Sequence, residues 1–183
     1  MLYRYKCSSA RWLNAIICSL LISSAFCQST QKTFSHLTVD EGLSHSSVYT
    51  ITQDNQGFMW FGTRNGLNRY DSRNVVVYQN QSTRKNSLAS NTINSLLVDK
   101  QGRLWVGTAK GLALYRPEQD DFQRMLTGGP ASHGLPDSTI NWLLEDHQQS
   151  LWIGTQGGLY RLNRQQQFEF LATLLQPPKT LRN

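Results

Sequence analysis

Short apolar segments separated by polar turns run along the chain from about residue 48 to about residue 172. Between residues 92 and 126, the turns KQG, AKG and PEQD separate the segments TINSLLVD, RLWVGT, LALYR and FQRML. Segments of this length, bounded by Gly, Asp and Asn, are typical of strands linked by hairpins. No segment shows the 3.6-residue period of a long amphipathic helix. The pattern therefore predicts four antiparallel strands in this stretch.

The same four-strand pattern occurs three times. The sequences MWFGTRNGLNRY, LWVGTAKGLALY and LWIGTQGGLYRL place Trp60, Trp105 and Trp152 at spacings of 45 and 47 residues. Four strands in a repeat of ~40–50 residues form the blade of a β-propeller. We therefore predict an all-β fold, an incomplete β-propeller of three four-stranded antiparallel blades. The expected parts are a lead-in at 28–47 with a closing strand (TFSHLT, 33–38), blades at 48–80, 93–127 and 140–172, and a tail at 173–183.

The three tryptophans are expected to be structural core between blades, because they recur at one position of the second strand. An aromatic platform for sugars is the alternative for these residues. The Asp-x-x-Gly sequences before them are predicted to be backbone turns, since they lack the dense alternating ligands of a calcium loop. The third copy has Gln149 in place of the glycine, so a left-handed backbone there would cost ~1–2 kcal/mol more.

In a four-stranded blade, the turn between the second and third strands lies on the same face as the blade-to-blade connectors. Polar groups on this face could bind sugar hydroxyls or uronate carboxylates. No catalytic or metal-ligating set stands out: Glu145 and Asp146 are adjacent, so on a strand they point to opposite faces. His45 and Asp137 come at equivalent connector positions without a convincing set of partners. The predicted ligand-binding residues are Arg64, Asn65, Arg84, Lys85, Lys110, His133 and Gln156.

Residues 1–27 have the pattern of a secretory signal, with a basic start and a short apolar stretch. We expect cleavage before Gln28 and a periplasmic location, with a lipid anchor at Cys27 or a retained membrane anchor as alternatives. All three cysteines precede residue 28, so no disulfide framework or thiolate metal site is expected in the exported part. Three of the 18 basic residues and none of the 12 acidic residues lie in the signal. The remaining 15 basic and 12 acidic residues do not predict nucleic-acid binding.

These repeats resemble the two-component regulator propeller. Its pattern is an aliphatic strand ending in Asp-x-x-Gly, then hydrophobic-Trp-hydrophobic-Gly-Thr, then x-x-Gly-Leu and a Tyr; the similarity covers about residues 33–172. The resemblance implies the N-terminal extracytoplasmic sensor region of a hybrid two-component or diguanylate cyclase-type regulator in the inner membrane. It also implies a propeller that recognises glycan fragments or supports dimerisation. The chain has no kinase nucleotide box and no GGDEF sequence, so we expect neither enzymatic output nor a cofactor from it.

Three blades are fewer than the four to eight with which propellers close. We therefore interpret the chain as a truncated piece of such a sensor, with self-association through its open blade edges as the alternative. The predicted function is non-catalytic sensing of an extracellular glycan or another small ligand. A periplasmic propeller lyase or hydrolase and a fragment without function are the competing hypotheses.

Overall fold

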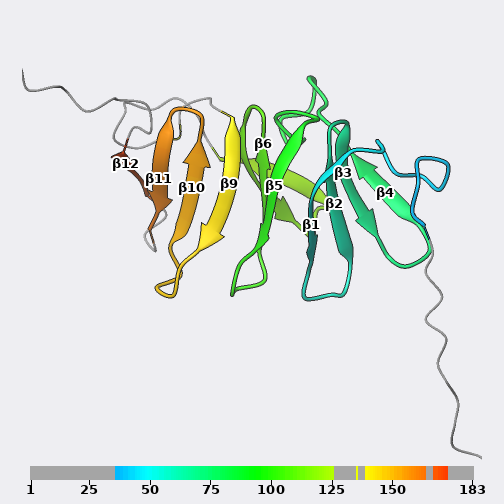
Figure 1. Ribbon diagram of the computed structural model, residues 1–183, viewed down its shortest axis with the longest axis horizontal. Helices are drawn as coiled ribbons and strands as arrows, with labels where there is room; N and C mark the ends of the chain where they lie inside the picture. The colour runs from blue at the N-terminus through cyan, green and yellow to red at the C-terminus, as the bar shows by residue number, and fades with distance from the viewer. Residues whose placement is uncertain (1–35, 126–134, 136–138, 164–166, 173–183) are drawn as a thin grey trace, which may run out of the picture. The chain divides into compact units, whose positions relative to one another are not determined.

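A computed structural model describes residues 36–125, 135, 139–163 and 167–172 of the chain. These residues form three four-stranded antiparallel sheets, and no helix occurs among them. The prediction of three propeller-type blades is therefore confirmed (Figure 1). In each sheet the strands lie in chain order. The strands are β1 (Val48–Gln53), β2 (Met59–Thr63), β3 (Gly66–Tyr70) and β4 (Val75–Tyr78) in blade 1; β5 (Ile93–Val98), β6 (Leu104–Thr108), β7 (Gly111–Arg116) and β8 (Asp121–Arg124) in blade 2; and β9 (Ile140–Glu145), β10 (Leu151–Thr155), β11 (Gly158–Leu162) and β12 (Phe168–Ala172) in blade 3.

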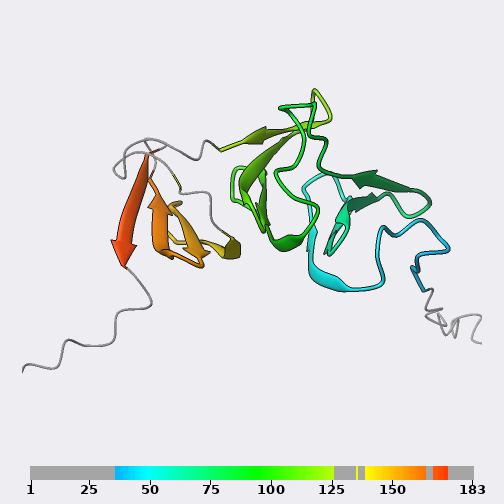
Figure 2. The same ribbon diagram turned by 90° about the horizontal axis from the view of Figure 1, so that it is seen from above.

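The first strand of each blade lies against the first strand of the next blade, so that β5 contacts both β1 and β9. The N–H of Leu96 in β5 donates to Oγ1 of Thr50 in β1 at 3.2 Å. The N–H of Leu143 in β9 donates to Oγ of Ser95 in β5 at 3.1 Å. A hydroxyl group at one repeat position thus holds the innermost strand of the following blade. Figure 2 shows the same three sheets after a 90° turn, as separate groups of strands.

The apolar core lies between the blades. One cluster joins Trp60 of blade 1 to Val106 of blade 2, and a second joins Trp105 of blade 2 to Ile153 of blade 3. Each blade therefore turns its tryptophan toward the next blade and the aliphatic residue beside that tryptophan toward the previous one. Trp60 and Trp105 are fully buried. Trp152 is only half-buried, because no further sheet covers it within the part of the chain that the structure describes.

The glycine of the Trp-x-Gly-Thr sequence allows the blades to approach closely. A Cβ atom on Gly62 would lie 2.7 Å from Cγ2 of Ile93 in blade 2, and one on Gly107 would lie 2.7 Å from Cγ2 of Ile140 in blade 3. Such distances are too short for carbon atoms, so a side chain at either glycine would push the blades apart. At Gly154 the nearest side chain would be 3.4 Å away and belongs to blade 3 itself.

A repeated aspartate fixes the first hairpin of each blade. In blade 2, Oδ1 of Asp99 accepts two backbone N–H groups of the turn at 3.0 and 2.9 Å, and Oδ2 accepts the indole N–H of Trp105 at 2.8 Å. Asp54 and Asp146 accept the corresponding indole N–H groups at 2.7 and 2.8 Å. The prediction of backbone turns is confirmed. Gln149 has a φ of 62°, so the third turn holds a non-glycine residue in the left-handed region.

The predicted closing strand at 33–38 is not formed in its described part, because residues 36–38 belong to no strand. Residues 33–35, the predicted signal at 1–27 and the tail at 173–183 lie outside the described residues. Residues 39–47 of the lead-in resemble a blade-to-blade connector, since Leu43 is buried in the same way as Leu88 and Leu135. No helix in the described part is long and apolar enough to cross a membrane.

Candidate functional site

The turn between the second and third strands has the same construction in all three blades. In blade 1, Oγ1 of Thr63 donates to the carbonyl of Gly66 at 2.9 Å and accepts the N–H of Asn65 at 3.0 Å. Thr108 and Thr155 donate to the equivalent glycine carbonyls at 2.8 and 2.9 Å. The three glycines have φ values of 134°, 117° and 147°, which other residues adopt only under strain. The sequence Gly-Thr-x-x-Gly therefore fixes the turn and leaves its two central residues free to vary.

Neighbouring turns are joined through one threonine at each blade boundary. Oγ1 of Thr92 donates to the carbonyl of Arg64 at 3.3 Å, while its own carbonyl accepts the N–H of Ala109 at 3.0 Å. Thr139 repeats this arrangement, donating to the carbonyl of Ala109 at 3.2 Å and accepting the N–H of Gln156 at 3.0 Å. A continuous chain of hydrogen bonds thus links the turns of blades 1, 2 and 3.

Four of the predicted ligand-binding residues lie on these linked turns. The side chains of Arg64, Lys110 and Gln156 are exposed and form no hydrogen bond or ion pair with any residue that the structure describes. Asn65 is also exposed and makes one long contact, from Nδ2 to the carbonyl of Ser44 at 3.5 Å. None of the six residues at the tips of the three turns is acidic. The turns therefore present a row of cationic and amide groups on a fixed backbone.

Of the other three predicted residues, two belong to the connector between blades 1 and 2, and one lies outside the described residues. Arg84 lines a separate surface cavity of about 250 Å³ between blades 1 and 2, together with Asp121. The hydrogen bonds from Arg116, and more weakly the charge of Arg84, hold the pKa of Asp121 below its usual value. Lys85 is exposed and is bound to no described residue, and His133 lies outside the described residues.

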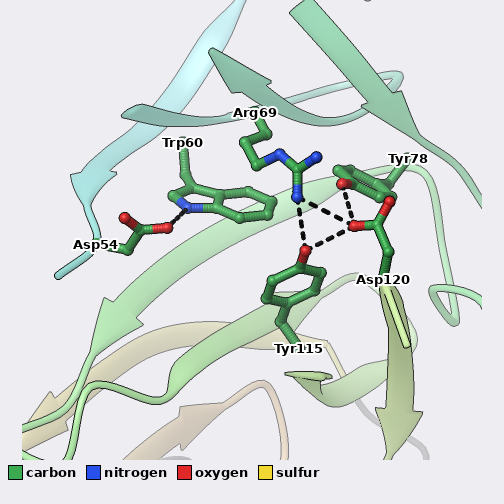
Figure 3. A network of polar contacts seen from close by, with 6 residues as sticks. All are labelled: Asp54, Trp60, Arg69, Tyr78, Tyr115 and Asp120. Atoms are coloured by element: carbon green, nitrogen blue, oxygen red, sulfur yellow. Dashed lines mark hydrogen bonds and ion pairs between the residues drawn. The ribbon is translucent and has the colours of Figure 1, made fainter. Parts of the chain in front are cut away.

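A polar cluster that was not predicted from the sequence joins blade 1 to blade 2 (Figure 3). Oδ1 of Asp120, in the turn between β7 and β8, accepts the hydroxyl groups of Tyr78 and Tyr115, both at 2.6 Å. Nη1 of Arg69 donates to the Tyr115 hydroxyl at 2.7 Å and lies 3.1 Å from the same Asp120 oxygen. The guanidinium of Arg69 also lies over the ring of Tyr78, 5.6 Å from its centroid.

The charge states of this cluster suit structure rather than proton transfer. Burial raises the pKa of Tyr78 far above its ordinary value, and the hydrogen bond to Asp120 raises it further. Burial also opposes ionisation of Asp120, but the hydrogen bonds from Tyr115 and Tyr78 and the charge of Arg69 outweigh it and lower the Asp120 pKa. Neutral phenols and an ionised carboxylate are therefore stable around neutral pH, where a general acid or base would titrate. The cluster clamps the two blades together.

A metal site or a catalytic site among the described residues would require a group of suitable side chains that lie close together. No three His, Cys, Asp or Glu side chains in that part of the chain are grouped so that they could hold a metal ion. Nδ1 of His45 accepts the N–H of Ser47 at 2.9 Å, which caps a turn in the lead-in. Asp137, its predicted counterpart, lies outside the described residues.

Three segments of the chain, at residues 42–65, 87–110 and 134–157, match the family model described as two component regulator propeller. Each match ends within the turn between the second and third strands of its blade. A protein named histidine kinase P4, from Formosa agariphila, is 38% identical over 76 residues, which are 42% of this chain and 6% of that protein.

Solved structures with similar folds include the extracellular domains of two proteins named as hybrid two component systems, both from B. thetaiotaomicron. The first is 29% identical with a TM-score of 0.68, and the match covers 75% of this chain and 20% of that one. The second is 31% identical with a TM-score of 0.59, and the match covers 69% of this chain and 17% of that one. The chain thus spans about a fifth or less of the length of these relatives.

Proposed function

Since the chain belongs to the two-component regulator propeller family, we propose that its blades form part of a non-catalytic, extracytoplasmic sensor that binds an anionic glycan. The proposal places the ligand on the linked turns of the three blades. The observation that carries it is the row formed by Arg64, Lys110 and Gln156, whose side chains are exposed and unpaired among the described residues.

The other repeated polar groups are already occupied within the fold. Asp54, Asp99 and Asp146 bind turn amides and indole N–H groups. The turn threonines bind the glycine carbonyls. The turn side chains are therefore the repeated positions at which the sequence can vary without altering a blade. Variable positions on a fixed backbone are where binding residues concentrate in other folds.

The chemistry of the row favours a carboxylated sugar over a neutral one. Arg and Lys donate charge-assisted hydrogen bonds to carboxylates, and the amides of Asn65 and Gln156 can both donate to and accept from hydroxyl groups. No carboxylate stands among the residues at the turn tips to repel an anion. A sugar acid bound there would meet donors from more than one blade.

Calorimetric titration with an oligouronate, and with the neutral oligosaccharide of the same length, tests this proposal. We expect binding of the oligouronate that weakens with salt, because exposed charges are screened. Replacing both Arg64 and Lys110 with alanine should weaken it roughly tenfold, since two exposed charge pairs contribute ~0.2–1 kcal/mol each and the hydrogen bonds add to them. Lys85→Ala is the matched control, because Lys85 is an exposed cation that belongs to the connector between blades 1 and 2 and not to a turn, and it should have no effect.

Two outcomes would count against the proposal. Equal affinity for the neutral oligosaccharide, or an equal loss with Lys85→Ala, would remove the role assigned to the turns. Release of shortened or unsaturated sugar products during incubation with the protein would show catalysis and favour a lyase or hydrolase instead.

A further inference from the structure

The two outer blades each expose an apolar sheet face. On blade 3, Trp142 and Leu144 are 77% and 64% exposed and lie on the same side of the sheet as Trp152. On blade 1, Ile51 is 56% exposed and lies on the side of the sheet that carries Phe61. We propose that these faces bind each other between two copies of this chain, so that blade 3 of one copy covers blade 1 of the other.

The two exposed faces correspond to the two different sides that meet at each boundary between blades. At both boundaries within the chain, a blade presents its tryptophan side and the next blade presents the opposite side. The blade 3 face, formed by Trp142, Leu144 and Trp152, is a tryptophan side. The blade 1 face, formed by Val48, Ile51 and Phe61, is the opposite side. Each free face therefore lacks the kind of partner that the other supplies.

One close contact occurs at both internal boundaries, and the residues equivalent to its two partners lie on these two exposed faces. At the boundary between blades 2 and 3, Ile140, the first residue of β9, fills the space over Gly107, 2.7 Å from where a Cβ would stand. The boundary between blades 1 and 2 repeats this contact. On the blade 3 face, Gly154 has no such neighbour among the described residues. On blade 1, Val48 is the first residue of β1 and is suited to fill that space.

The hydrogen bond by which a threonine links neighbouring turns also has an equivalent donor on blade 1 and an equivalent acceptor on blade 3. Oγ1 of Thr139 in blade 3 donates to the carbonyl of Ala109 in blade 2 at 3.2 Å. In blade 1 the equivalent position before the first strand is Ser47, which is exposed and also carries a hydroxyl group. The equivalent acceptor at the other end is the carbonyl of Gln156. A second copy would bring this donor and acceptor together.

One position differs from the internal boundaries, and the difference favours an apolar contact. Thr50 and Ser95 supply hydroxyl groups to the next innermost strand, whereas the equivalent residue of blade 3 is Trp142. The indole of Trp142 is exposed, whereas Ser95 is buried at the boundary between blades 2 and 3. Against the blade 1 face the indole would cover Ile51, so that two of the most exposed apolar residues of the described part are removed from water together.

The described residues of two copies joined in this way would supply six blades and two identical contacts. Six blades lie within the four to eight with which propellers close. A head-to-tail contact that closes forms a ring rather than a filament. The proposal does not depend on the glycan-binding turns, because neither face includes their side chains.

Sedimentation velocity of the full chain over a wide range of concentrations tests the contact. We expect a two-chain species that dissociates on dilution, and a blue shift of the tryptophan emission as that species forms. Trp142→Glu and Ile51→Glu should each abolish it. Val76→Glu is the matched control, because Val76 is also an exposed apolar residue but belongs to the side of blade 1 that faces blade 2. Circular dichroism of each variant checks that its blades are folded.

Mixing the two disruptive variants provides the sharper test. The Ile51→Glu chain keeps an intact blade 3 face, and the Trp142→Glu chain keeps an intact blade 1 face, so a mixture should recover two-chain species that neither variant forms alone. A monomer at every concentration would overturn the proposal and leave blades of a longer protein to cover the faces. Association that survives both variants, as would occur through residues 1–27, or a mixture without recovery, would overturn it equally.

Discussion

Replacing Asp99 with alanine is expected to destabilise the protein more than any other single change in the hairpin turns. Asp99 is buried and accepts four hydrogen bonds, from two turn amides, the side chain of Arg103 and the indole of Trp105. Its counterparts Asp54 and Asp146 are only half-buried, so water can replace part of what they supply.

The expected loss of stability depends on whether each donor can find another acceptor once the Asp99 carboxylate is removed. The indole N–H of Trp105 is fully buried and would remain unsatisfied, which costs ~1–3 kcal/mol. The turn amides and the Arg103 side chain are partly exposed and can turn to water, at about 0.5 kcal/mol each. The free energy of unfolding should therefore fall by about 3 kcal/mol. Asp54→Ala and Asp146→Ala should cost less.

Urea denaturation followed by circular dichroism measures this loss. With a slope of ~1–3 kcal/mol per molar urea, the midpoint should fall by about 1–3 M. Glu118→Ala is the control, since Glu118 is exposed and hydrogen-bonds to no described residue. Trp105→Phe removes the stranded indole donor, so it should cost clearly less in the Asp99→Ala background than in the wild-type protein. Additive effects within about 0.5 kcal/mol would refute the proposed link between the two residues.

Acid provides a second check on the same carboxylate. Burial opposes ionisation of Asp99, but hydrogen bonds from Trp105 and Arg103 outweigh it and hold the pKa of Asp99 below its usual value. A lowered pKa means that the ionised carboxylate stabilises the fold above its ordinary pKa of ~3.9, and that this contribution is lost as the pH falls through the folded-state pKa. The stability difference between wild type and Asp99→Ala should therefore shrink in acid.

Three further changes test other parts of the account. Gln149→Gly should raise the urea midpoint by relieving a left-handed backbone, for a net gain of ~0.5–1 kcal/mol after the entropy cost of glycine; a loss of stability would contradict the strain assigned there. Gly107→Ala should lower the melting temperature through a clash with Ile140, costing ~1–3 kcal/mol, and an unchanged value would show that the blades can separate freely. Tyr115→Phe should cost ~1–2 kcal/mol at neutral pH, with a smaller effect in acid as Asp120 is protonated; a pH-independent loss would argue against the clamp.

The repeated residues made the blades predictable from the sequence. Trp60, Trp105 and Trp152 recur with the same flanking turns, so their register and the strand order could be inferred from spacing alone. The half-burial of Trp152 could not be inferred, because it depends on which blade follows. The bond from each tryptophan to its aspartate was also missed, although both partners recur six residues apart.

Features that occur only once in the described blades could not be predicted by comparing the repeats with one another. The clamp of Arg69, Tyr78, Tyr115 and Asp120 joins residues far apart in sequence, and at the next boundary Leu114 stands in the place of Arg69. Arg84 was grouped with the turns on loop order, but its connector follows the outer strand of blade 1 and carries it to the cavity beside Asp121. Loop order predicts which face a residue lies on, but it does not predict how far from the centre of that face it lies.

We propose that the linked turns bind an anionic glycan while the rest of each blade is structural. Backbone NMR of the labelled protein, titrated with an oligouronate, tests this most directly. We expect the largest chemical-shift changes at the turns carrying Arg64, Lys110 and Gln156, and no change at the hairpins of Asp54 and Asp99. Changes confined to those hairpins or to the cavity at Arg84, or no changes with any oligouronate, would contradict it.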